Sequence, residues 1–150
     1  MPSRIRRFIS NGYFIFKHPE LAELYFKRDE DLQTKREMRR KFKNQAIINE
    51  LKADDKALGD AVETLYERVI DYGAHPNKKS LSSVLKKIDL EDSIRFELSY
   101  STNNPLVIRL GLKTATQVGI ACLKIAEKVL PERFTIVGLA DKIKQLSRVF

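Results

Sequence analysis

The sequence predicts a mainly α-helical fold, a bundle of five or six helices with one short β-strand or hairpin. Apolar residues recur at spacings of three and four over most of the chain, which is the period of an amphipathic helix. One short stretch near residue 95 instead alternates apolar and polar residues, as a half-buried strand does. The 150 residues are 43% hydrophobic, and no internal repeat or Gly/Ser-rich linker divides them. We therefore expect a single helical domain over residues 1–150.

The N-terminal segment, residues 1–17, is basic at first and then aromatic. Its apolar run at residues 13–16 follows the turn-like pair Asn11-Gly12, so the run is either a short strand or the start of a helix. A proline in the first position and a glutamate after it then predict a short helix over 19–28.

Two longer helices are expected next. Asp29 or Asp31 can cap a helix that we place at about 31–52. The helix at about 54–73 is the most clearly indicated, because its apolar residues recur at spacings of four and three. Five residues form its predicted core stripe: Leu58, Val62, Leu65, Val69 and Tyr72. Because Pro76 disfavours helical dihedrals in the residue before it, we expect this helix to end between residues 72 and 75.

A short helix capped by Ser80 is expected to follow, with four apolar residues on one face: Leu81, Val84, Leu85 and Ile88. The stretch 93–101 then has the alternation of a strand. A lone strand needs a partner, either the aromatic run near Phe14 or the same strand in a second subunit.

The C-terminal third returns to helical patterning. Asn104 and Pro105 open a long helix that stops before Pro131. The last amphipathic helix is marked by four apolar residues: Leu139, Ile143, Leu146 and Phe150. Small residues at positions 111, 115 and 119 share one side of the long helix, where they would let another helix approach closely.

Charge and composition limit the classes of function. Lys and Arg outnumber Asp and Glu by 28 to 20, so the formal charge is +8 and an anionic partner such as RNA must be considered. The chain has no tryptophan, which fits a solvated helical surface better than a base-stacking platform.

Cysteine usage and hydropathy predict where the protein resides. Cys122 stands alone, and we recognise no signal peptide or transit-type leader, so we expect a cytoplasmic protein. The apolar stretch 106–126 is interrupted by Arg109, Lys113 and Lys124, which would be costly at the middle of a bilayer. We expect this stretch to be a buried helix and not a membrane span.

The candidate catalytic residues are Arg68, Asp71 and His75, which continue a polar stripe from Thr64 beside the core stripe of the same helix. One alternative is an exposed ion pair between Arg68 and Asp71, with His75 near the negative end of the helix. The other is a site in which His75 transfers a proton, Arg68 holds a phosphate and Asp71 orients one of them. Metal-independent cleavage of RNA requires proton transfer and a cation for the charge on phosphorus, and these residue types supply both.

The sequence Arg68-Val-Ile-Asp-Tyr-Gly-Ala-His75 resembles the Arg-x4–6-His motif of the HEPN superfamily (higher eukaryotes and prokaryotes nucleotide-binding). The resemblance implies a helical bundle, often dimeric, which in many members is a metal-independent ribonuclease of toxin or phage-defence systems. It implies that motif copies from two subunits face each other, and it carries over Arg68 and His75 only. Many relatives of such enzymes have lost catalysis and serve as binding or dimerisation modules.

A basic run offers candidate nucleic-acid-binding residues. Arg36, Arg39, Arg40 and Lys43 are expected on one face of the 31–52 helix, with Met38 and Phe42 on the opposite side. The run is either a solvated outer face or a surface that contacts phosphates.

No metal site or small-molecule cofactor is expected, because the good transition-metal ligands His18, His75 and Cys122 are not paired on one element and no phosphate-binding loop is present. Cys122 lies among apolar residues and is expected to be a core thiol. The sequence thus predicts a HEPN-like homodimer that acts on RNA, or a non-catalytic helical dimerisation or binding module.

Overall fold

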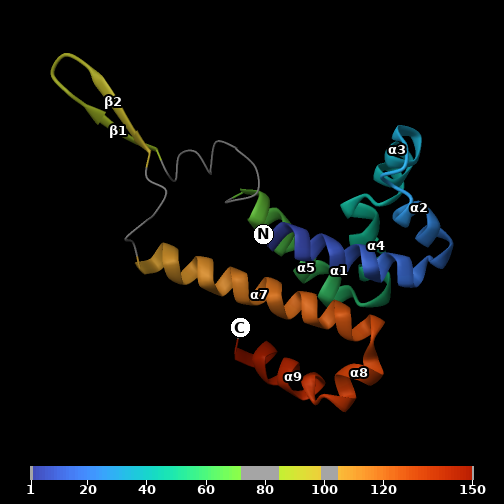
Figure 1. Ribbon diagram of the computed structural model, residues 1–150. Coiled ribbons are helices and arrows are strands. Elements are labelled where there is room, and N and C mark those ends of the chain that lie inside the picture. The colour runs from blue at the N-terminus through green and yellow to red at the C-terminus, as the bar shows by residue number, and fades with distance from the viewer. Residues whose placement is uncertain (1, 72–84, 99–104, 150) are drawn as a thin grey trace.

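The computed structural model describes the backbone of residues 2–71, 85–98 and 105–149 and the side chains of residues 9–71, 85–97 and 105–148. The fold is mainly helical with one antiparallel hairpin, as predicted. Figure 1 shows α1 (Pro2–Lys17) lying along the long helix α7 (Pro105–Val129), with α4 (Asn44–Asp54) and α5 (Lys56–Val69) beside them. A single domain over the whole chain stays a prediction.

The first helix runs straight through the turn-like Asn11-Gly12 pair. Tyr13 is fully buried and Phe14 is 7% exposed, and they belong to two separate apolar clusters. Burial of both sides of α1 outweighs the weak local preference for a turn. The alternative of a strand at residues 13–16 is therefore wrong.

The expected helix over 19–28 is formed by a 3-10 turn, Pro19–Leu21, and the short α2, Ala22–Phe26. Asp31 caps the next helix, α3 (Leu32–Lys41), by accepting a hydrogen bond from the Thr34 backbone N–H at 2.8 Å. This confirms Asp31, and not Asp29, as the cap.

The expected helix over 31–52 is broken in two at Phe42. Phe42 packs with Phe14 and Ile47 in a buried cluster, and Lys43 adopts an extended conformation before α4 begins at Asn44. Continuous helical patterning did not reveal the break, because both halves are good helix formers and burial of Phe42 decides the bend. Lys43 therefore does not share a helical face with Arg36, Arg39 and Arg40, which corrects that part of the prediction.

Helix α5 carries most of the predicted core stripe. Leu58 is buried, and Val62 and Leu65 pack against the main cluster, which also contains Tyr13 and Leu51. The helical turns continue through Asp71, and Tyr72 lies outside the described residues. Asp55 caps α5 by accepting from the Leu58 N–H at 3.0 Å.

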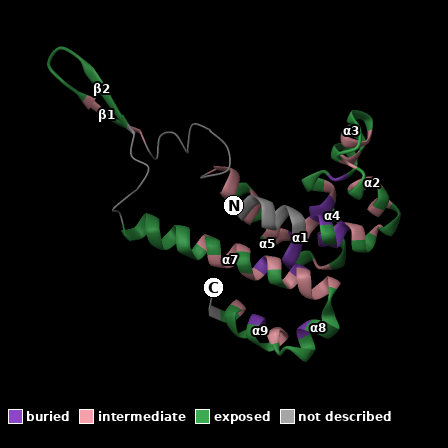
Figure 2. Cartoon of the chain, in the orientation of Figure 1, coloured by how far each residue is buried: buried purple, intermediate pink, exposed green. Residues whose placement is uncertain are grey.

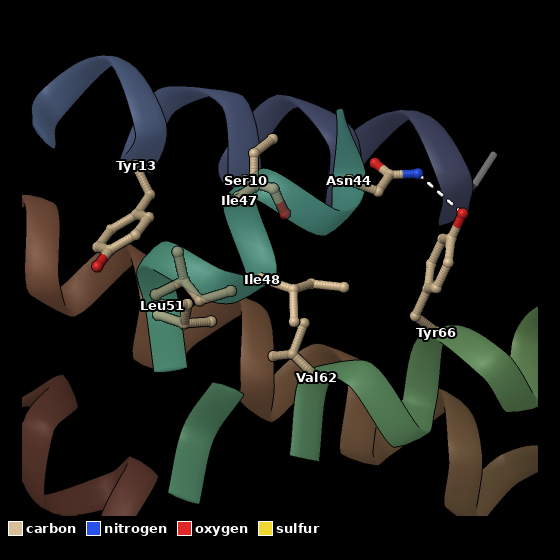
Figure 3. Close-up of a pocket in the computed structure, with 9 residues that line it drawn as sticks. Ser10, Tyr13, Asn44, Ile47, Ile48, Leu51, Val62 and Tyr66 are labelled. Carbon is tan, nitrogen blue, oxygen red and sulfur yellow. Dashed lines mark hydrogen bonds between the residues drawn. The ribbon is translucent and has the colours of Figure 1, made fainter. Parts of the chain in front are cut away.

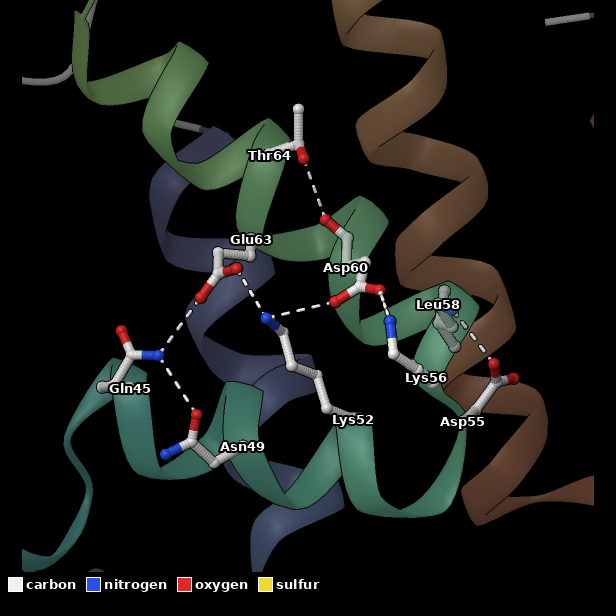
Figure 4. Close-up of polar contacts among 9 residues, drawn as sticks. All are labelled: Gln45, Asn49, Lys52, Asp55, Lys56, Leu58, Asp60, Glu63 and Thr64. Atoms are coloured by element: carbon white, nitrogen blue, oxygen red, sulfur yellow. Dashed lines mark hydrogen bonds and ion pairs between the residues drawn. The ribbon is translucent and has the colours of Figure 1, made fainter.

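Helices α4 and α5 are joined by a network of charged and amide side chains (Figure 4). Lys52 Nζ lies 2.6 Å from a Glu63 carboxylate oxygen and 3.1 Å from Asp60 Oδ1. The hydrogen bonds from Lys52 hold the pKa of Glu63 below its ordinary value. Gly59 permits the close approach, because a Cβ there would stand 2.7 Å from Lys52 Cα.

The hairpin consists of β1 (Leu85–Asp89) and β2 (Ile94–Leu98), paired so that Lys87 faces Phe96. The alternation that predicted β2 is confirmed, but the expected helix containing Leu85 and Ile88 is wrong, because both lie in β1. That strand is the partner of β2, so the proposed pairing with the aromatic run near Phe14 is also wrong. Ser80, Leu81 and Val84 lie outside the described residues.

The predicted long helix is confirmed as α7, and Pro131 begins the short α8, Pro131–Ile136. Gly138, at φ 65°, makes the turn into α9 (Leu139–Val149), which packs back on α7. Ile143 is buried, as its pattern predicted, whereas Leu146 is 43% exposed. Phe150 lies outside the described residues.

The expectation that residues 106–126 form a buried helix is wrong for the first half of α7. Figure 2 shows that half exposed, and the buried residues of α7, Ala121 and Ile125, lie in its second half. Leu106 is 63% exposed and Leu112 is 66% exposed. By length and composition α7 is apolar enough to cross a membrane, a test that core helices of soluble proteins also pass.

Candidate functional site

Arg68 lines a groove of about 380 Å³ between α5, α7 and α9. Thr64 and Arg68 stand one turn apart on α5, Gln117 and Lys124 lie two turns apart on α7, and Ser147 approaches from α9. The first two residues of the polar stripe that the sequence indicated on α5 therefore face a real concavity, whereas Asp71 does not line it. Its volume is in the range of pockets that hold small ligands.

The Arg68 guanidinium is held by a neutral amide. Its Nη1 donates to Oε1 of Gln117 at 3.1 Å. Within the described residues, neither Arg68 nor Lys124 forms an ion pair with a carboxylate, so the expected Arg68–Asp71 pair is absent from this part of the chain. A guanidinium without a carboxylate partner keeps its charge and most of its donors available to an anion.

Asp60 is the acidic residue of the Arg68 groove, and its charge is compensated by two lysines. Lys56 Nζ lies 2.7 Å from Asp60 Oδ2, and Lys52 Nζ lies 3.1 Å from Oδ1. Hydrogen bonds from Lys56 and then Lys52 hold the pKa of Asp60 below its ordinary value. The carboxylate therefore stays ionised and paired, and it leaves Arg68 and Lys124 to set the sign of the groove.

Of the other two candidate catalytic residues, the structure describes Asp71 but not His75. Asp71 follows α5 by two residues and is half-buried. His75 lies outside the described residues, so its approach to Arg68 stays a prediction. The sequence did not single out Gln117 or Lys124 as site residues; their seven-residue spacing on one side of α7 was the signal that could have found them.

The basic run on α3 separates into two faces. All four basic residues are exposed, but Arg39 and Lys43 line a second groove whereas Arg36 and Arg40 do not. Met38 is half-buried and packs against the Phe42 cluster, as its position predicted. The four candidate nucleic-acid-binding residues thus form one pair in a groove and one pair on the outer surface.

Neither groove contains a cluster suited to a transition metal. Among the described residues, no group of three or more His, Cys, Asp or Glu side chains is placed to hold a metal ion. Cys122 is half-buried on α7, so it is less buried than a core thiol was expected to be.

A small cavity of about 30 Å³ lies beneath α1 and is mainly apolar (Figure 3). Tyr13, Ile48 and Leu51 line it, and Asn44 Nδ2 donates to the Tyr66 hydroxyl at its edge at 2.9 Å. The cavity is about the size of one water molecule. It is a packing defect of the core and does not offer a ligand site.

Comparison of the chain with protein-family models, curated proteins and solved structures finds no match.

Proposed function

We propose that this protein is a HEPN-like helical protein that acts on RNA as a metal-independent endoribonuclease. The observation that carries the proposal is the position of Arg68, which faces a groove, is oriented by Gln117 at 3.1 Å and has no carboxylate partner among the described residues. Lys124 adds a second cation to the same groove. Two such cations suit a bound phosphodiester.

In the proposed reaction, Arg68 binds the phosphate and stabilises the charge that develops on phosphorus. His75 accepts the proton of the ribose 2′-hydroxyl as that oxygen attacks phosphorus, the bond from phosphorus to the 5′-oxygen breaks, and the imidazolium returns the proton to this leaving oxygen, so that a 2′,3′-cyclic phosphate and a 5′-hydroxyl result. Histidine suits both roles because imidazole can accept and donate a proton. Asp71 orients one of these two side chains. Seven residues separate Arg68 from His75 in the sequence, a spacing that in a continuous helix is about two turns or roughly 10 Å of rise, which the long arginine side chain can reduce.

The test is incubation of purified protein with single-stranded RNA in the presence of a chelator. Wild-type protein is expected to cleave the RNA, and His75→Ala is expected to lower the rate by about 10²-fold or more, the usual contribution of a general acid or base. Arg68→Ala should weaken RNA binding as well as the rate. Arg133→Ala is the matched control, because it removes an exposed arginine from α8 that lines neither groove.

Cleavage that continues unchanged in His75→Ala would eliminate this site. Wild-type protein that binds RNA through Arg68 without cutting it would instead support the non-catalytic alternative.

One specific observation favours that alternative, a dimerisation module. The first half of α7 exposes a run of large apolar side chains: Leu106, Val107, Ile108, Leu110 and Leu112. Gly111 lies within this run and Gly119 about two turns beyond it, and both have open space where a Cβ would stand. A second copy that packs on this surface would remove the apolar side chains from water.

Light scattering after size-exclusion chromatography tests this alternative. The wild-type protein is expected to be a dimer, and Leu110→Glu is expected to be a monomer with an unchanged helical circular dichroism spectrum. A monomeric wild type at high micromolar concentration would refute dimerisation. Oligomeric state and RNA cleavage are measured independently, so either proposal can be refuted without affecting the other.

A further inference from the structure

A second groove, here called the α3–α4 groove, has a volume of about 520 Å³ and is strongly basic. It lies between α1, the segment after α2, α3, the start of α4 and one turn of α5. It shares no lining residue with the Arg68 groove. Among its described lining residues are four cations, Arg28, Lys35, Arg39 and Lys43, and one carboxylate, Asp29.

The positive charge is concentrated at one end of the α3–α4 groove. Asp29 compensates its neighbours, because its carboxylate lies 3.3 Å from Arg28 Nε and 3.8 Å from Lys35 Nζ. In the described part of the chain, Arg39 and Lys43 form no ion pair. The uncompensated charge therefore belongs to Arg39 and Lys43, where α3 ends and α4 begins.

Helix α4 points its N-terminus into the same end of the groove. Lys43 occupies the cap position and Asn44 the first helical position, and both residues line the groove. No side chain of the described residues caps this eleven-residue helix. Its first backbone N–H groups and the positive end of its dipole are therefore available to an anion.

Asn11 supplies an independent polar group in the same groove. The residue as a whole is only 7% exposed, and it lines the α3–α4 groove from the middle of α1. Within the described residues, no hydrogen bond involves the Asn11 amide. Among the described residues, the buried side-chain polar atom without a hydrogen-bond partner is the Tyr13 hydroxyl and not an atom of Asn11, so the Asn11 amide still reaches the groove, where a polar ligand can bind it.

We propose that the α3–α4 groove binds a phosphate group, either a phosphodiester of an RNA strand or the phosphate of a free nucleotide. Arg39 and Lys43 supply the charge, the first turn of α4 supplies backbone donors, and the Asn11 amide donates from the floor. Arg36 and Arg40, on the outer face of α3, take no part in this site. The proposal extends beyond the Arg68 site and does not depend on cleavage.

Nuclear magnetic resonance with inorganic phosphate as the probe tests the site. Titration at constant ionic strength, with chloride as the reference anion, is expected to shift the Asn11 side-chain amide and the backbone amides at the start of α4 in a saturable manner. Arg39→Ala/Lys43→Ala is expected to weaken binding by about tenfold or more, since hydrogen bonds to charged groups contribute about 1.5–3 kcal/mol each.

Arg36→Ala/Arg40→Ala is the matched control, because it removes the same charge from the same region without touching the groove. Its affinity for phosphate is expected to stay within about twofold of wild type, as for a screened surface charge. Asn11→Ala should weaken binding at unchanged net charge, and circular dichroism checks that it folds. Equal losses in the two double variants, or shifts that chloride reproduces, would overturn the proposal.

Two further probes distinguish the sources of phosphate: adenosine 5′-monophosphate, and a short RNA that has hydroxyl groups at both ends. Both are added to the His75→Ala background, so that cleavage cannot consume the RNA. Shifts with the nucleotide alone identify a phosphomonoester site, and shifts with the RNA identify a phosphodiester site. If neither probe shifts the Asn11 amide, the groove is not a phosphate site of either kind.

Discussion

Replacing Asp54 by asparagine should destabilise the protein at neutral pH but not in acid. Asp54 ends α4 and accepts from Lys17 of α1 at 2.8 Å, and Lys128 of α7 lies 3.0 Å from its second oxygen. The Asp54 carboxylate thus connects three helices, α1, α4 and α7. The hydrogen bonds from Lys17 and then Lys128 lower its pKa from 3.8 to about 2.

The pKa of Asp54 sets both the size and the pH window of the effect. A folded-state pKa below the unfolded value stabilises the fold above pH 3.8, and this contribution is lost as the pH falls towards 2. The full difference between the unfolded and folded pKa values of Asp54 corresponds to about 2.4 kcal/mol of folding stability. The Asp54 side chain is 28% exposed, so solvent screening reduces the expected contribution to about 1 kcal/mol.

Urea denaturation of wild type and Asp54→Asn, followed by circular dichroism between pH 7 and pH 2.5, measures this contribution. Wild type should be more stable by about 1 kcal/mol at pH 7, and the difference should shrink below pH 4. Asp141→Asn is the control, because Asp141 is 85% exposed and its contact with Lys144 is 4.0 Å long. A difference that is constant over the whole pH range, or an equal effect in Asp141→Asn, would refute the reasoning.

Two further predictions concern packing. Leu51 is 2% exposed in the main cluster, so Leu51→Ala should lower the free energy of unfolding by about 2–5 kcal/mol in thermal or urea denaturation; a loss below about 1 kcal/mol would show that the cluster is not well packed. Gly59→Ala should destabilise the protein, because the new Cβ would stand 2.7 Å from Lys52 Cα. Gly12→Ala, in open space within α1, should instead raise the unfolding temperature through better helix propensity. If both alanines have the same effect, the close approach of α4 and α5 is not tight.

The sequence predicted those elements in which local pattern and tertiary packing agree. The three-and-four spacing of α5 and the Pro105 start of α7 were confirmed, and so was the alternation of β2. Two of the failures, the turn expected at Asn11-Gly12 and the unbroken helix expected through Phe42, arose where packing overrides local preference. Asn11-Gly12 resembles a turn but lies inside a helix, because Tyr13 and Phe14 are buried on different sides of it.

The hairpin shows a different limit of sequence patterns. Leu85 and Ile88 are three apart and so fit a helix, yet they belong to the strand that pairs with β2. The partner of β2 lies immediately before it in the chain, and the Leu90 N–H donates to the Ser93 carbonyl at 2.8 Å across the turn. Short turns are the commonest way to join antiparallel strands, so the segment just before β2 was a better candidate for its partner than a distant one.

The candidate sites were predictable only in part, because grooves depend on several elements at once. The Thr64–Arg68 stripe was visible in the sequence, since it needs only the period of one helix. Gln117 and Lys124 are about fifty residues away and reach Arg68 only after α7 packs on α5. The burial of Asn11 could not be inferred at all, because asparagine in a turn-like pair is ordinarily exposed.

The break between α3 and α4 limits which insertions and deletions the chain can accept during evolution. Each residue of a helix is rotated by about 100° around the axis from the one before it, so one residue inserted into the last turn of α3 would rotate the preceding part of α3 relative to α4 by that angle. Both helices and all their side chains would persist, yet Arg39 would face away from the start of α4. The length of this junction is therefore under constraint independently of which amino acids form it, and deletions there should be tolerated less well than substitutions.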